Sequence, residues 1–299
     1  MISIIIPLYN KQEQIVSCIK SVLSQSFRSF EIVIINDGST DKSLEKISQL
    51  SDPRIRIFKQ RNSGVSAARN RGISEAKYDF IALLDADDLW HKNYLQTQWE
   101  LHLKYPACNV CACNYEYKNS SGKITQTKIN GLKFNCKDGV IDNYFDVASR
   151  SNPPICSSSI MIKKSALQLI GGFPVGITSG EDLLTWARLA VNNKIAYSKS
   201  TQAIYVTENS FTPKRKITNF DPVGDSLYKL YSEHPSKYLL KYNSLWHKNR
   251  CNIALRNNQG ILAFSEAFKA LKYDHFNYKI YIYILLIFSP KKIIQKFLH

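Results

Sequence analysis

The stretch that decides the fold is Phe80-Ile81-Ala82-Leu83-Leu84-Asp85-Ala86-Asp87-Asp88-Leu89-Trp90. Its apolar half has the length of a buried strand, and the acids that follow would lie at the edge of a sheet. Three anions within four residues repel one another, so they need water, a cation or hydrogen-bond donors beside them. Mg2+ or Mn2+ would suit, since both prefer oxygen ligands. The alternative is a helix start near Trp90, capped by Asp87 or Asp88.

The residues before this stretch alternate between predicted strands and helices. Strands are expected at 2–7, 30–35 and 55–58 and a helix at 12–24, and the segment 62–72 leads into a further helix. This alternation predicts an α/β fold with a doubly wound, mostly parallel sheet whose ligand lies at the carboxyl ends of the strands. The polar clusters of this half, among them Asn36 to Asp41, follow those ends.

The second half of the chain has a different pattern. A hairpin is expected from 108–117 and 123–128, a strand at 155–163 and a short helix at 165–170. Glu181 and Asp182 then open an amphipathic helix. Two acids there are either a capping and dipole device or a source of a general base.

The charge and the cysteine content suggest the kind of partner and the cellular compartment. The chain has 40 Lys and Arg against 24 Asp and Glu, and the excess is concentrated toward the end, which suggests an anionic partner. Seven cysteines and a strand-like beginning without a charged leader predict a cytoplasmic protein with reduced thiols. Cys108, Cys111 and Cys113 are expected to be small buried strand residues rather than zinc ligands.

Residues 213–299 are expected to form a basic helical extension to a domain at 1–212. Its apolar run at 280–288 is too short to span a bilayer, which takes about 20 residues. The run suits an interfacial anchor at the inner face of the cytoplasmic membrane, with the basic residues after it meeting anionic lipid. Those residues are Lys291, Lys292 and Lys296. A terminal helix packed on its own core is the alternative.

Three other classes of protein share some of these features. A nicotinamide oxidoreductase lacks support, because no G-x-G-x-x-G follows the first strand. A nucleic-acid partner is not expected, because the charge accompanies an apolar tail and no recognition motif is present. A non-catalytic ligand-binding protein is the third class, and it remains the alternative to an enzyme.

Six motifs in sequence order resemble those of bacterial family 2 glycosyltransferases with the GT-A fold, over roughly the first 210 residues. They are Pro7-Leu8-Tyr9-Asn10, Asn36-Asp37-Gly38-Ser39-Thr40-Asp41, Gly64-Val65-Ser66-Ala67-Ala68-Arg69-Asn70, Leu84-Asp85-Ala86-Asp87-Asp88, Gly171-Gly172-Phe173 and Gly180-Glu181-Asp182.

The resemblance implies roles for individual residues. The donor would be bound by the residues Pro7, Tyr9, Asn10, Asp37, Arg69, Asp85 and Ala86. Asp37 would accept a hydrogen bond from the uracil of a UDP-sugar. In the Asp-X-Asp motif Asp85 would face the ribose or sugar and Asp87 would bind the metal, with Asp88 as a further ligand. Asp182 would be the catalytic base, with Glu181 beside it.

The chemistry implied by the resemblance is inverting, metal-dependent sugar transfer with Mn2+ or Mg2+. The donor would be a nucleotide sugar and the acceptor a glycan or lipid-linked glycan, as in bacterial surface polysaccharide synthesis. One departure from the family pattern stands out. A histidine often follows the last core strand in the family, whereas this chain reads Tyr205-Val206-Thr207-Glu208-Asn209-Ser210. The metal site would then be completed by water, by Glu208 or not at all.

Overall fold

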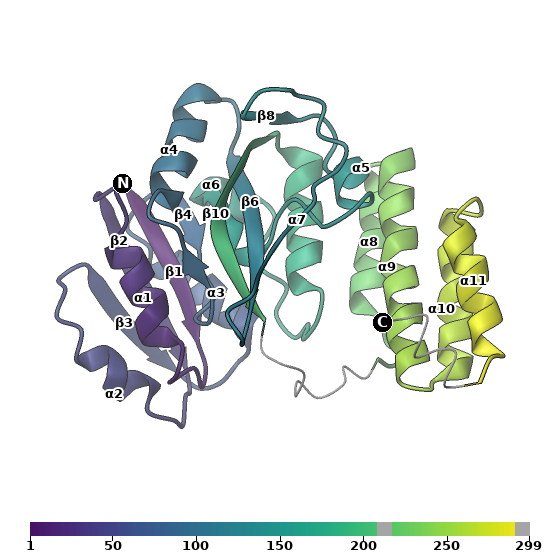
Figure 1. Ribbon diagram of the computed structural model, residues 1–299, viewed down its shortest axis with the longest axis horizontal. Helices are drawn as coiled ribbons and strands as arrows, with labels where there is room; N and C mark the ends of the chain where they lie inside the picture. The colour runs from purple at the N-terminus through teal and green to yellow at the C-terminus, as the bar shows by residue number, and fades with distance from the viewer. Residues whose placement is uncertain (208–216, 291–299) are drawn as a thin grey trace. The chain divides into compact units, whose positions relative to one another are not determined.

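The computed structural model describes residues 1–207 and 217–290 (Figure 1). The chain divides into two compact units. The first comprises Met1–Val147 and Ser151–Glu208, and the second Ala148–Arg150 and Asn209–His299. The boundary expected between residues 212 and 213 falls outside the described residues.

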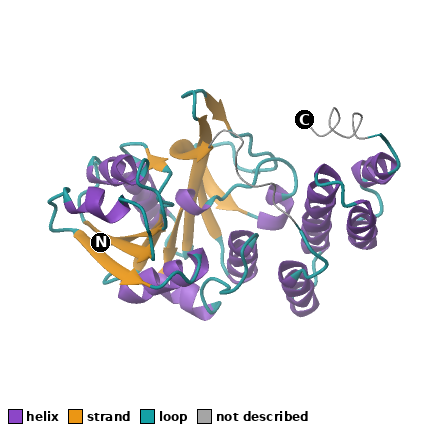
Figure 2. Ribbon diagram, turned by 90° about the horizontal axis from the view of Figure 1, so that it is seen from below, coloured by secondary structure: helices purple, strands orange, loops and turns teal. Residues whose placement is uncertain are grey.

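The first unit alternates strands and helices as the sequence pattern predicts (Figures 1 and 2). Its elements are β1 (Ile2–Leu8), α1 (Ile15–Leu23), β2 (Phe30–Asp37), α2 (Ser43–Ser48), β3 (Ile55–Gln60), α3 (Val65–Glu75), β4 (Phe80–Leu83), β5 (Leu89–Trp90), α4 (Tyr94–Lys104), β6 (Val110–Asn119), β7 (Ile124–Gln126), β8 (Asp138–Ile141), α5 (Tyr144–Ala148), a 3-10 turn (Ser157–Ser159), β9 (Ile160–Lys163), α6 (Lys164–Leu169), α7 (Glu181–Asn192) and β10 (Ile195–Thr207).

The strands form one sheet in the order β3-β2-β1-β4-β9-β6-β10-β5, with β7 paired to β6 and β8 to β10. The first four strands of this order are parallel, as predicted. The other half is mixed, because β9 runs antiparallel to both β4 and β6. Since β1, β2 and β4 are parallel neighbours, the loops that follow them leave the sheet at the same edge.

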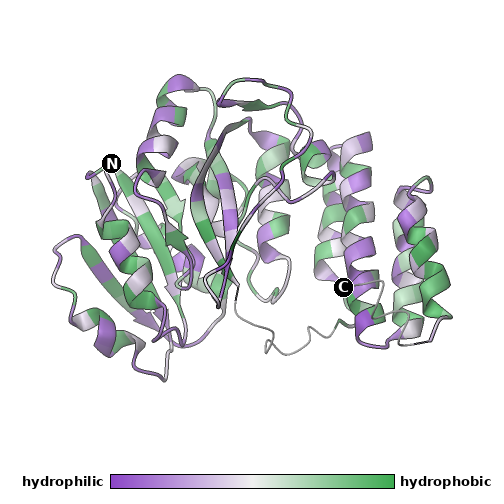
Figure 3. Cartoon of the chain, viewed as in Figure 1, coloured by the Kyte–Doolittle hydropathy of each residue, from purple (hydrophilic) through white to green (hydrophobic). Residues whose placement is uncertain are grey.

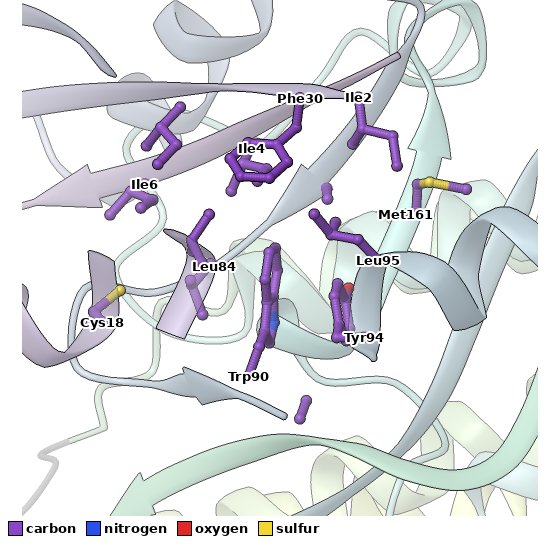
Figure 4. Packing of buried hydrophobic residues seen from close by; sticks show 14 of the residues in the cluster. Ile2, Ile4, Ile6, Cys18, Phe30, Leu84, Trp90, Tyr94, Leu95 and Met161 are labelled. Atoms are coloured by element: carbon purple, nitrogen blue, oxygen red, sulfur yellow. The ribbon is translucent and has the colours of Figure 1, made fainter. Parts of the chain in front are cut away.

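The two faces of β1 pack against different helices. Ile4 and Ile6 belong to the cluster that includes α1 and α4, where the rings of Trp90 and Tyr94 stack 3.9 Å apart (Figure 4). Ile5 faces α3, where a Cβ added to Gly72 would lie only 2.3 Å from its Cγ2. Apart from Ser3, the strand is apolar, because both faces of the sheet are covered.

Two predicted elements differ from the structure. No helix begins at Trp90. The short strand β5 occupies Leu89 and Trp90, and α4 begins only at Tyr94, so Asp87 and Asp88 cap no helix. The strand expected at 155–163 is restricted to Ile160–Lys163, because a 3-10 turn of three serines precedes it.

The second unit is helical. It contains α8 (Pro222–Glu233), α9 (Lys237–Arg256), α10 (Gly260–Tyr273) and α11 (Tyr278–Ile287). Asp221 caps α8 by accepting a hydrogen bond from Gly224 N, and Pro222 suits the first helical turn. Within the described residues, no helix combines the length and apolar character needed to cross a bilayer.

Four charged or titratable side chains are buried between the helices of this unit. The Nε of Arg250 lies 3.2 Å from Asp221 Oδ2 and 3.1 Å from Glu266 Oε2, and His247 Nδ1 lies 2.7 Å from the same Glu266 oxygen. Asp221, His247 and Glu266 are close enough to hold a metal ion. A guanidinium already pairs with both of these carboxylate oxygens, so the cluster is an internal ion-pair network.

We predict that Glu266→Gln lowers the stability of the helical unit above about pH 4.5 and has little effect near pH 2. Burial alone would raise the pKa of Glu266, but the hydrogen bond from His247 and the ion pair with Arg250 lower it from 4.5 to about 2. A lowered carboxyl pKa stabilises the folded state above the unfolded value and loses that contribution as pH falls through the folded value, here about 3 kcal/mol.

Urea unfolding of the wild type and the variant between pH 7 and pH 2 measures the difference. Glu233→Gln is the control, because Glu233 is exposed and its ion pair with Lys229 is long, at 3.9 Å. A stability difference between wild type and Glu266→Gln that does not change with pH would contradict the prediction.

Candidate functional site

The loops after β1 and β2 are joined by side-chain hydrogen bonds. Asn10 N donates to Ser39 Oγ at 3.1 Å, and Asn10 Oδ1 accepts from Thr40 N at 2.8 Å. Asn10 has a φ of +50°, a left-handed conformation that asparagine tolerates. Further along, Gln12 N donates to Asp41 Oδ2 at 3.0 Å. The two loops therefore hold each other in place.

Asp37 lies at the end of β2 and is almost fully buried. Its Oδ1 accepts hydrogen bonds from Gln60 Nε2 at 2.8 Å and Ser63 N at 2.9 Å, and its Oδ2 accepts from Gly64 N at 2.8 Å. A carboxylate offers about four lone-pair positions. Three are used by these donors, which leaves Asp37 one acceptor position.

The three carboxylates after β4 have different partners. Asp85 Oδ1 accepts from Arg69 Nη2 at 2.7 Å. Asp87 Oδ2 lies 2.6 Å from the Nζ of Lys11, in an ion pair about a quarter exposed. Asp88 is buried, and within the described residues no ion pair joins it to a cation. Each of the three carboxylates thus has its own partners, which offset the repulsion between the like charges.

Both oxygens of Asp88 are held by protein donors. Ser158 Oγ donates to Oδ2 at 2.5 Å and Val206 N donates to Oδ1 at 2.9 Å. Burial, followed by the charges of Asp85 and Asp87, raises the pKa of Asp88 well above its usual value. This burial argues against the expected role of Asp88 as a metal ligand and favours a role in tying β4 to β10.

Arg69 connects the end of β4 to the start of α7. Its side chain is 3% exposed, and its Nη1 lies 3.6 Å from Glu181 Oε1 while Nη2 binds Asp85 and Ser157 Oγ. The guanidinium also lies over the ring of Phe173, 5.1 Å from the ring centre. Burial by itself lowers the pKa of Arg69, but Asp85, Asp182 and Glu181 raise it overall.

The start of α7 presents two acids together. Gly180 precedes the helix with φ +83°, a conformation that glycine adopts without strain. Burial raises the pKa of Glu181, and the charge of Asp182 adds to the rise, while Arg69 opposes it. Asp182 is half-buried, and its Oδ1 accepts from Leu183 N at 2.8 Å. The carboxylates of α7 and of β4 therefore share one buried cation.

The structure brings together part of the set of residues that the sequence indicates. Arg69, Asp85 and Glu181 are in contact, and Asp87 and Asp182 adjoin them in the chain. The loop residues are more varied: Pro7 is half-buried, Tyr9 is 48% exposed and Ala86 is buried. Glu208, considered for completing a metal site, lies outside the described residues.

Sequence analysis missed three residues of this site. Lys11 follows the Pro7-to-Asn10 motif directly, and a lysine in a loop at the edge of the sheet was a usable signal. Ser157 and Ser158 gave none, because their segment resembled the start of a strand. Ser158 also accepts a hydrogen bond from Asp85 N at 3.1 Å.

We predict that Arg69→Met destabilises the first unit by about 3 kcal/mol, because it leaves the acids of β4 and α7 without their buried cation. Arg69→Lys should recover part of the loss, since it restores the charge without the guanidinium geometry.

Urea unfolding measures these effects. Arg71→Met is the matched control on the same helix, because Arg71 is about half exposed and pairs with Glu75 within α3. It should change stability by no more than about 0.5 kcal/mol. An equal effect of the two Met variants would contradict the assignment.

Comparison with known proteins gives relatives that are described as glycosyltransferases. The chain is 35% identical over 202 residues to an uncharacterised glycosyltransferase of Rickettsia conorii, covering 65% of this chain and 31% of the relative. It is 27% identical over 218 residues to glycosyltransferase GlyA of Streptococcus pneumoniae, covering 71% and 31%. The chain thus spans about a third of the length of these relatives.

A solved structure shares the fold. S. aureus TarS residues 1–349, in complex with UDP-GlcNAc, superposes with a TM-score of 0.71 at 17% identity, covering 99% of this chain and 89% of that one. The sequence profile of glycosyl transferase family 2 matches residues 3–169, more than half of the chain. The chain belongs to glycosyl transferase family 2 and has its GT-A fold.

Proposed function

We propose that this glycosyltransferase is an inverting, metal-dependent enzyme that moves a sugar from a nucleotide-sugar donor to a hydroxyl of a glycan or lipid-linked glycan. The observation that carries the proposal is the cluster built around Arg69. It joins the acids at the end of β4, expected at the donor, to the acids at the start of α7, expected at the acceptor.

UDP is the preferred nucleotide in this proposal. Asp37 has one acceptor position beyond the three that the protein fills, and the N3–H of uracil is a donor that suits it. The tied loops after β1 and β2 would place Pro7, Tyr9 and Asn10 around the nucleoside. Support comes from TarS, whose structure holds UDP-GlcNAc.

The residues present fit a divalent cation. Asp87 offers partly exposed carboxylate oxygen. Among the described residues Arg69 contacts Oδ1 of Asp85, so Oδ2 would be left to a ligand. Oxygen ligands of this kind suit Mg2+ or Mn2+. Bound there by Asp87, with Asp85 beside it, the ion would neutralise charge on the leaving diphosphate.

In this proposal, a residue of the chain itself takes the proton of the acceptor hydroxyl. In transfer with inversion, the acceptor oxygen forms a bond to the anomeric carbon while the bond from that carbon to the diphosphate oxygen breaks. The diphosphate keeps the electron pair, and Asp182 takes the hydroxyl proton as general base. Glu181, whose pKa is raised, would position Asp182 through their shared partner Arg69.

Association with the inner face of the cytoplasmic membrane also belongs to the proposal, and α11 supports it. Of the run at 280–288, Ile280 and Leu286 pack into the core of the helical unit, so the whole run is not available to lipid. Four residues at helical spacing point outward instead. They are Tyr278, Tyr281, Leu285 and Phe288, which are 66%, 48%, 70% and 77% exposed. Figure 3 shows much of α11 in the colours of hydrophobic residues.

This outward apolar face suits a shallow position in an anionic bilayer. Aromatic side chains favour the headgroup boundary, and the flanking charge is basic. The three lysines after α11, at 291, 292 and 296, lie outside the described residues. Such a location would bring the enzyme to a lipid-linked acceptor and to surface polysaccharide synthesis.

Release of free nucleotide from a panel of nucleotide sugars tests the enzyme class, with Mn2+, with Mg2+ and with EDTA. Slow, metal-dependent release from one donor is expected and would identify the sugar. Donor binding without release, even with lipid-linked acceptors present, would favour the alternative of a non-catalytic nucleotide-sugar binder.

We predict that Asp182→Asn slows sugar transfer by at least about 100-fold, because general-base catalysis is worth roughly 10² to 10⁴. Donor affinity should stay close to the wild-type value, which calorimetric titration with UDP checks. Asp225→Asn is the control, since Asp225 also lies in the first turn of a helix but on an exposed surface. Turnover of Asp182→Asn near the wild-type rate would refute the role of the base.

For the membrane, we predict that Leu285→Glu weakens sedimentation with vesicles that contain phosphatidylglycerol by about tenfold, because it places a charge in the outward face of α11. Leu103→Glu is the matched control, because Leu103 is 62% exposed on α4 of the other unit. Equal binding by both variants and the wild type would remove this face from the proposal.

A further inference from the structure

Among the residues that the structure describes, Lys11 is the ion-pair partner of Asp87, whose contact is more exposed than those of the other two carboxylates after β4. Asp85 is bound by the buried Arg69, and Asp88 is fixed by Ser158 and Val206. Asp87 instead pairs with a lysine whose side chain is 29% exposed, at 2.6 Å between Nζ and Oδ2. A lysine ammonium on its flexible stem can leave such a contact at little cost.

The backbone of Lys11 is fixed although its side chain can move. Lys11 N donates to Ser43 Oγ at 3.0 Å, and the neighbours Asn10 and Gln12 are both bonded to the loop after β2. The ammonium is therefore tethered beside Asp87 whichever partner it contacts. Any anion that comes next to Asp87 comes within reach of Lys11.

Competition for Asp87 then links the two ligands. Without a ligand, Asp87 pairs with Lys11, while Arg69 is shared by Asp85 and Glu181. A divalent ion alone would have to displace the ammonium from Asp87 and would offer it no new anionic partner. A divalent ion together with a nucleotide-sugar diphosphate, which carries two negative charges, places an anion beside the displaced ammonium.

We propose that Lys11 couples metal binding to donor binding: it is the counter-ion of Asp87 in the ligand-free enzyme and transfers to the donor diphosphate when the metal binds Asp87. The inference rests on the proposed metal-dependent function. Lys11 is a positioning residue for the donor that also disfavours metal without nucleotide. The coupling is reciprocal, so the metal must raise the affinity for nucleotide by the same factor as the nucleotide raises that for metal.

The test is Mn2+ binding to the full chain, followed by electron paramagnetic resonance of the free ion, with and without UDP. In Lys11→Met, Mn2+ should bind about fivefold tighter without UDP, because a partly exposed ion pair no longer competes. UDP in the presence of Mn2+ should bind about tenfold weaker, because a charge-assisted contact is lost. The coupling factor should fall accordingly.

Three variants complete the experiment. Lys11→Arg keeps the charge and should keep the coupling. Lys42→Met removes an exposed lysine from the adjoining loop and should change neither affinity. Asp87→Asn should abolish Mn2+ binding. Circular dichroism checks that each variant is folded.

The outcomes separate this inference from the function on which it rests. If the wild type binds Mn2+ with UDP but Lys11→Met binds Mn2+ alone no tighter, the inference is wrong and the metal-dependent function stands. If the wild type binds no Mn2+ even with UDP, both are wrong.

Discussion

The ion pair between Arg69 and Asp85 is the contact on which the site depends. A buried guanidinium is tolerated only with carboxylates around it, and the acids of β4 and α7 are tolerated together only with a cation between them. Each therefore requires the other, and Ser157 and Phe173 complete the enclosure. The sheet edge and the start of α7 are held in one arrangement before any substrate is present, which is the preorganisation that transfer chemistry needs.

Much of the first unit could be predicted from the sequence. Apolar runs that end in polar groups identify β1, β2 and β4 and place their loops at one edge, because buried parallel strands have no polar face. The direction of β9 could not be predicted, since a short apolar run has the same pattern in either direction. The same limit explains the serine turn before it, whose hydroxyls matter only through partners far along the chain, such as Asp88.

The helical unit was predictable in outline and not in detail. The sequence indicated that this extension is helical, but it does not show which buried charges meet. The pair of Arg250 and Glu266 joins α9 to α10 through tertiary packing. The terminal apolar run contained two signals at once. Ile280 and Leu286 stabilise the unit, while Tyr281 and Leu285 between them face outward, and only a folded helix separates these roles.

The hydrogen bonds between the loops after β1 and β2 bear on any attempt to redesign the enzyme. The side chain of Asn10 accepts a hydrogen bond from the backbone of the second loop, and the side chain of Ser39 accepts one from the backbone of the first. The conformation of each loop therefore depends on the other. Substitutions that exchange one loop for that of a relative would break these contacts and misplace Lys11 as well. A change of nucleotide preference should therefore be sought by transplanting both loops as a single cassette.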